Sequence, residues 1–279
     1  MDTRFAVNGD VRLAYDDPGP PGGDPLLMII GLGASRFWWP PGLLDCLREH
    51  GFRPAVMDLR DTGESTRMTT AYRAEDLADD AAAVLDALGW PAAHVFGLSF
   101  GGTIAQRLAL RHPARVRTLT TFAAGPSDAG LATVMLRYLR WRRQVPLLRL
   151  TRRTPDDVAL AEGVLAAAAT REYPAEDGMA RDAVARERAR GLRSFRDMAA
   201  QGRQTRARWH GPPLRDLRVP ALIICGAADP LVRPRASRDT AAAIPGARLL
   251  VLPGVGHFPP RPVWPVIAAE MRALADRAS

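Results

Sequence analysis

A serine stands between glycines in the segment GLSFG, residues 97–101. The apolar run 93–96 before it predicts a strand, and residues 103–111 after it have the spacing of a helix. On such a strand-to-helix turn the serine hydroxyl is exposed, and flanking glycines relieve the crowding of the backbone. We therefore interpret Ser99 as a candidate nucleophile, and an ordinary glycine-rich turn is the alternative.

A serine hydroxyl needs a base to accept its proton. His257 follows the predicted strand 248–252 in a glycine- and proline-rich loop, and the end of that strand would open on the same sheet edge as Ser99. His210 is the alternative base. The other histidines lie at the ends of predicted helices or strands: His50, His94 and His112.

The third member of such a site is a carboxylate that orients the histidine. Asp229 follows the predicted strand 221–225 and precedes a helix, which gives the chain order Ser, Asp, His that is typical of this arrangement. Asp128 is the rival position, because it comes just after the preceding strand. A surface turn is the plain alternative for Asp229.

Acyl transfer also needs N–H donors aimed at the developing oxyanion. One should be the backbone N–H of Phe100, directly after the nucleophile. The other should come from residues 31–33, which follow the apolar strand 26–30, and Leu32 is the candidate. We predict no metal or organic cofactor.

Strand and helix patterns alternate along the chain, which predicts an α/β fold with a mostly parallel sheet flanked by helices. Residues 1–126 and 216–279 form the predicted core, and residues 127–215, which lack a convincing strand, form a helical cap, or lid. The predicted strands are 4–7, 11–15, 26–30, 54–58, 93–98, 117–123, 221–225 and 248–252. The predicted helices of the core are 38–50, 74–88, 103–111, 235–244 and 263–278.

The net charge is +8, and all 38 basic residues are arginine. Residues 127–215 contain 18 arginines against 10 acidic residues. Such a segment could attract an acidic substrate, an acidic carrier protein or nucleic acid, although a solvated helical face explains it more simply. No basic motif with interleaved aromatic residues supports nucleic-acid binding.

Two cysteines cannot form a multi-bridge framework, and no signal peptide or apolar run of about 20 residues is visible. A soluble, cytoplasmic protein without a membrane span is therefore expected. Nothing in the sequence predicts the oligomeric state.

Residues 58–65, DLRDTGES, match the pattern D-x-R-G-x-G-x-S with aspartate at its fourth position, and Ile30-Gly31 stands where relatives often have His-Gly. With the Ser99, Asp229 and His257 segments, this resembles the α/β-hydrolase superfamily over nearly the whole chain. The variant motif is similar to the aclacinomycin methylesterase-like group of polyketide-tailoring esterases. The resemblance implies an eight-stranded α/β-hydrolase fold with a helical lid, and hydrolysis of a carboxylic ester through an acyl-enzyme.

The expected substrate is a bulky, mainly apolar small molecule, such as a polyketide-type methyl ester. Aromatic residues that could line its pocket, or belong to the core, are Phe37, Trp38, Trp39, Trp141 and Trp209. A thioesterase or acyltransferase acting on groups bound to an acidic carrier protein is the main alternative. A C–C bond hydrolase and a non-catalytic ligand-binding protein are further alternatives.

Overall fold

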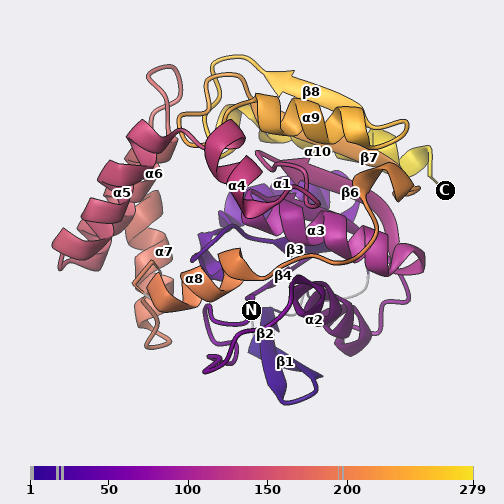
Figure 1. Ribbon diagram of the computed structural model, residues 1–279, viewed down its shortest axis with the longest axis horizontal. Coiled ribbons are helices and arrows are strands. Elements are labelled where there is room, and N and C mark those ends of the chain that lie inside the picture. Colours follow the sequence, from indigo (N-terminus) through magenta and orange to yellow (C-terminus); the bar gives the residue numbers. More distant parts are fainter. Residues whose placement is uncertain (1–2, 17–18, 20–21, 194, 197, 279) are drawn as a thin grey trace.

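The computed structural model describes residues 3–16, 19, 22–193, 195–196 and 198–278. An eight-stranded sheet with the order β1-β2-β4-β3-β5-β6-β7-β8 runs through the molecule (Figure 1). β1 pairs antiparallel with β2, β2 pairs antiparallel with β4, and every other pair is parallel. The strands are β1 (Thr3–Asn8), β2 (Val11–Asp16), β3 (Asp24–Ile29), β4 (Phe52–Met57), β5 (Ala93–Leu98), β6 (Val116–Phe122), β7 (Ala221–Gly226) and β8 (Arg248–Leu252). The predicted fold class is confirmed.

Helices cover both faces of the sheet, because each helix buries one apolar stripe. α2 and α3 contribute Leu77 and Ile104 to one core cluster, and α1 and α10 contribute Leu47 and Ile267 to the other. β5 and β7 are buried along their whole length, which explains their mostly apolar sequences, with His94 as the polar exception in β5. The helices of this part are α1 (Pro41–Glu49), α2 (Ala74–Ala87), α3 (Phe100–Arg111), α9 (Arg235–Ala243) and α10 (Trp264–Asp276).

Residues 127–215, which we call the cap segment, join β6 to β7. Their described part contains helices and no strand of the sheet, and α5 to α7 gather on one side of the molecule (Figure 1). Within the described residues no helix is long and apolar enough to cross a membrane. The helices are α4 (Leu131–Thr133), the π-helical turn η3 (Val134–Tyr138), α5 (Trp141–Arg153), α6 (Asp157–Ala168), α7 (Met179–Arg188) and α8 (Met198–Arg206).

Two helix starts differ from the sequence prediction by three residues, and α10 begins one residue later than predicted. α1 begins at Pro41 rather than at residue 38, because residues 36–38 form a separate 3₁₀ turn and proline at the first helical position fixes the start. α3 begins at Phe100, directly after Ser99, rather than at residue 103. Residues 38–40 therefore lie outside α1, whereas residues 100–102 belong to the first turn of α3.

Candidate active site

The ends of three parallel strands bring Ser99, Asp229 and His257 together. His257 Nε2 lies 3.0 Å from Ser99 Oγ, and His257 Nδ1 lies 2.8 Å from Asp229 Oδ2. Asp229 is 1% exposed and His257 is 6% exposed, so both interactions are largely shielded from water. The three side chains therefore form one continuous hydrogen-bonded line.

Ser99 occupies a sharp turn between β5 and α3. Its φ of 53° is unusual for a residue with a side chain and costs roughly 1–3 kcal/mol, which the surrounding packing must offset. A Cβ at Gly97 would lie 2.4 Å from the Gly101 carbonyl oxygen, and a Cβ at Gly101 would lie 2.1 Å from the Ile29 carbonyl oxygen. The glycines are thus required by close approach of the backbone, as the sequence pattern predicts.

The Asp229 carboxylate is held on both of its oxygens. Oδ1 accepts the backbone N–H groups of Leu231 at 2.7 Å and Val232 at 2.8 Å, which leaves Oδ2 for His257. The His257 backbone N–H donates to the carbonyl of Ala168, at the end of α6. The cap segment therefore contacts the histidine loop directly.

Residues 31–39, which we call the oxyanion loop because they contain the predicted donor Leu32, pass beside the serine. A Cβ at Gly31 would lie 3.4 Å from Ser99 Cβ and 3.9 Å from Ser99 Oγ. In the part of the chain that the structure describes, neither the Leu32 nor the Phe100 backbone N–H donates a hydrogen bond to the protein. Both N–H groups thus remain available to a ligand oxygen.

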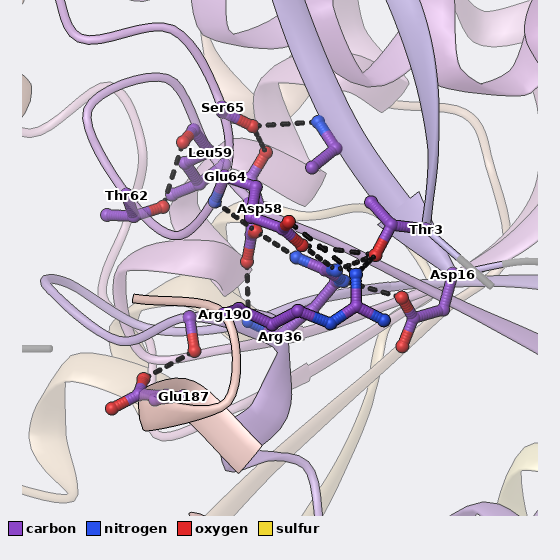
Figure 2. A network of polar contacts seen from close by, with 12 residues as sticks. Thr3, Asp16, Arg36, Asp58, Leu59, Thr62, Glu64, Ser65, Glu187 and Arg190 are labelled. Carbon is purple, nitrogen blue, oxygen red and sulfur yellow. Dashed lines mark hydrogen bonds and ion pairs between the residues drawn. The ribbon is translucent and has the colours of Figure 1, made fainter. Parts of the chain in front are cut away.

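A buried arginine attaches the oxyanion loop to the sheet (Figure 2). Arg36 donates its backbone N–H to Asp58 Oδ1 at 2.6 Å, and its guanidinium contacts the other Asp58 oxygen. The same guanidinium reaches Asp16 at 2.6 Å and Glu64 at 2.5 Å. The Arg36 side chain therefore connects the loop to β2 and to the segment after β4. The loop has Ile30-Gly31 in place of the His-Gly pair that relatives often have at its start.

The charges in this cluster depend on one another. Burial raises the pKa of Asp58, and the charge of Arg36 together with two backbone N–H bonds opposes that rise. Burial also acts to raise the pKa of Glu64, but the hydrogen bond and charge of Arg36 outweigh it, so the pKa of Glu64 is lowered. Removing Arg36 would leave buried carboxylates without their counter-charge.

A mainly apolar pocket is lined by Leu98, Gly256 and Phe258, which are chain neighbours of Ser99 and His257. Trp39 is one of its lining residues, and the indole N–H is buried without a hydrogen-bond partner among the described residues. The core residues of the lining are Trp38, Trp39, Pro40, Leu43, Leu98, Gly256, Phe258, Pro259, Pro260 and Trp264. The cap segment contributes Leu165, Ala169, Tyr173, Pro174, Ala175, Glu176 and Met179.

Three of the five predicted pocket aromatics do not line this pocket. Phe37 is buried and lies under the Arg36 guanidinium, 4.3 Å from it. Trp141 is 37% exposed at the start of α5. Trp209 packs against the α2–α3 side of the core and donates its N–H to the Pro212 carbonyl. The sequence identifies aromatic residues but not the direction in which each one faces.

The rival residues of the sequence analysis have other contacts. Asp128 Oδ2 accepts the backbone N–H of Leu214 at 3.0 Å. The His210 ring is mostly exposed, and its Nδ1 lies 3.5 Å from Glu75. His94 is buried and bonds Thr118 Oγ1 at 2.8 Å. Within the described residues, no group of three or more His, Cys, Asp or Glu side chains is arranged to hold a metal ion.

Two contacts between the cap segment and the core were not predicted from the sequence. Asp61, the unexpected aspartate of the 58–65 motif, adopts a φ of 70° and binds Arg203 of α8 at 3.1 Å. Glu187 of α7 reaches Ser35 of the oxyanion loop across 152 residues of sequence. The motif could have directed attention to Asp61, whereas no local pattern singles out Glu187.

Comparison with known proteins gives the same family as the fold. The α/β hydrolase fold family matches residues 24–260, and the chain belongs to that family. It is 31% identical, over 100% of both chains, to two proteins: rhodomycin D methylesterase DauP from Streptomyces sp. (strain C5) and rhodomycin D methylesterase DnrP from Streptomyces peucetius. The esterase RhEst1 from Rhodococcus sp. ECU1013 has a similar structure, with a TM-score of 0.74, 22% identity and coverage of 100% of both chains. The predicted resemblance to polyketide-tailoring methylesterases is confirmed.

Proposed function

We propose that this α/β-family hydrolase is a serine esterase that cleaves the carboxylic ester of a bulky, mainly apolar small molecule through an acyl-enzyme. The observation that carries the proposal is the hydrogen-bonded line from Ser99 through His257 to Asp229, beside the free N–H groups of Leu32 and Phe100. These are a nucleophile, a base with an orienting carboxylate, and two oxyanion donors.

In the first half of the reaction, Ser99 Oγ attacks the ester carbonyl carbon while His257 Nε2 accepts its proton. The carbonyl oxygen takes up negative charge and is stabilised by the Leu32 and Phe100 N–H groups. The bond to the alcohol then breaks, and His257 returns its proton to the leaving oxygen. Water repeats the same steps on the acyl-enzyme, which releases the acid and restores Ser99.

The pocket and the relatives support a polyketide-type methyl ester as the substrate. Methanol is a small leaving group, so the acyl part must supply the binding energy, and the apolar lining with Trp38, Trp39 and Trp264 offers aromatic surface to an aromatic acyl part. The thioesterase alternative has less support, because the two full-length relatives are methylesterases by name and some cap arginines that could attract an acidic carrier pair with acidic residues. Among them, Arg193 and Arg196 bind Asp157.

The test is the steady-state rate of the wild-type protein and of Ser99→Ala on p-nitrophenyl esters and on methyl esters of polycyclic aromatic acids. We expect kcat to fall by roughly 10⁴–10⁶ in Ser99→Ala. Ser127→Ala is the matched control, because Ser127 is buried elsewhere and its hydroxyl has no hydrogen-bond partner among the described residues. Activity that survives in Ser99→Ala would refute the assignment.

A further inference from the structure

A buried glutamate of the cap segment accepts hydrogen bonds from two residues of the oxyanion loop. Glu187, near the end of α7, accepts the hydroxyl of Ser35 at 2.5 Å and the indole N–H of Trp38 at 3.0 Å. Glu187 is 2% exposed and Ser35 is fully buried. A carboxylate buried to this degree needs hydrogen-bond donors, so Glu187 favours one placement of the loop.

A second cap residue contacts the loop just after Leu32. The Phe195 backbone N–H donates to the Gly33 carbonyl at 3.1 Å, and the Phe195 ring lies edge-on to Trp38 with centroids 4.9 Å apart. Phe195 has a φ of 62°, which a residue with a bulky side chain rarely adopts. The surrounding contacts must stabilise this backbone conformation, and the contacts with Gly33 and Trp38 are among them.

The same stretch of the cap also reaches the Arg36 cluster. Arg190 donates to Thr3 Oγ1 at 2.6 Å and lies 3.6 Å from Glu64, a partner of Arg36 (Figure 2). The cap therefore contacts the loop at Gly33, Ser35 and Trp38 through Glu187 and Phe195, and it contacts the charged cluster around Arg36 through Arg190.

We propose that Glu187 is a positioning residue that holds the Leu32 N–H beside Ser99. The entry of the loop is fixed by β3 and by Gly31 against Ser99, and its exit is fixed by Glu187 through Ser35 and Trp38. Leu32 lies between these two points. This inference rests on the proposed function, because the role of Leu32 is to bind the oxyanion.

The test compares Glu187→Ala, Glu187→Gln and the control Glu162→Ala. Glu162 belongs to the same cap and pairs with Arg181 on the exposed surface. We expect kcat to fall by roughly 10- to 10³-fold in Glu187→Ala, up to the loss of one oxyanion donor, with KM changed only a few-fold. Glu187→Gln keeps the accepting oxygen and should stay within about 3-fold of wild type. An unchanged kcat in folded Glu187→Ala would overturn the proposal.

Hydrogen–deuterium exchange gives a readout that does not depend on activity. In Glu187→Ala we expect faster exchange confined to the amides of residues 33–39, and wild-type exchange there in Glu187→Gln and Glu162→Ala. Unchanged exchange, or faster exchange across the whole chain, would overturn the proposal. If Glu187→Ala does not fold, Ser35→Ala carries the same test from the loop side.

The two hypotheses fail in different ways. If Ser99 does not react with a fluorophosphonate and no ester is cleaved, the proposed function fails. The exchange experiment then still decides whether Glu187 holds the loop. If Ser99 reacts and esters are cleaved, but Glu187→Ala behaves as wild type in both kcat and exchange, only the positioning role fails.

Discussion

Replacing Asp229 by asparagine should stop catalysis while leaving the fold in place. Oδ1 of Asp229 accepts the N–H groups of Leu231 and Val232, so in Asp229→Asn the carbonyl oxygen must take that position. The amide NH₂ then faces His257 Nδ1 and forces it to be the acceptor. The histidine proton consequently moves to Nε2, which points at Ser99 Oγ, so His257 can no longer accept the serine proton.

We expect kcat of Asp229→Asn to fall by roughly 10⁴, which corresponds to about 5.5 kcal/mol of transition-state stabilisation. The thermal midpoint should change little, because asparagine keeps both backbone bonds of the carboxylate. The assay is steady-state hydrolysis of the best ester of the panel, beside circular dichroism of the folded protein. Asp128→Asn is the matched control and should retain wild-type kcat, since Asp128 serves the backbone of Leu214.

The reasoning is refuted if Asp229→Asn keeps kcat within about tenfold of wild type. A collapse of kcat in Asp128→Asn, with Asp229→Asn active, would assign the orienting carboxylate to Asp128. A loss of the circular dichroism signal in Asp229→Asn would mean that the variant unfolds. The kinetic comparison would then use Asp229→Ser, which is small enough to leave the His257 loop in place.

Two further predictions concern stability. Gly101→Ala should lower the free energy of unfolding by at least about 2 kcal/mol, because its Cβ would lie 2.1 Å from the Ile29 carbonyl oxygen; an unchanged urea midpoint would contradict this. Burial, together with Arg117 and Arg272, lowers the pKa of His94 to about 4 from 6.5. The stability that neutral His94 contributes is therefore present above pH 6.5 and is lost as the pH falls toward 4, by up to about 3 kcal/mol. In His94→Gln, which has no proton to gain, the free energy of unfolding measured with urea should depend less on pH over that range. Equal pH dependence in both proteins would count against the prediction.

The sheet and the hydrogen-bonded line of three side chains could be predicted because their signals are local. Ser99 stands within a five-residue pattern, and Asp229 and His257 each follow a strand whose end lies at a known sheet edge. The contacts that hold the site could not be predicted in the same way. Glu187 meets Ser35 only because α7 packs beside the 3₁₀ turn after β3, and no periodicity in either segment encodes that approach.

The arginine cluster shows why a loop without His-Gly can still be rigid. Arg36 binds the same Asp58 carboxylate through its backbone N–H and through its guanidinium, so the loop cannot shift without breaking both bonds. A single surface ion pair would contribute little, but this one is buried and shared with Asp16 and Glu64. The Arg36 side chain thus holds the backbone of this loop in place.

The cap segment contacts the His257 loop at Ala168 and Thr170, and it contacts the oxyanion loop at Glu187 and Phe195. Ala168 accepts the backbone N–H of His257, and Phe195 donates to Gly33 of the oxyanion loop. Most of the cap residues that line the pocket lie between these two points, in the range 169–179. Substitutions at Tyr173, Ala175 or Met179 can reshape the pocket and leave these contacts in place. Thr170 lies in the same range but donates its hydroxyl to the Gly254 carbonyl of the His257 loop, so its substitution would disturb that loop. Selectivity for the acyl part can therefore change separately from the chemistry at Ser99, whereas substitutions at the contact residues would alter both.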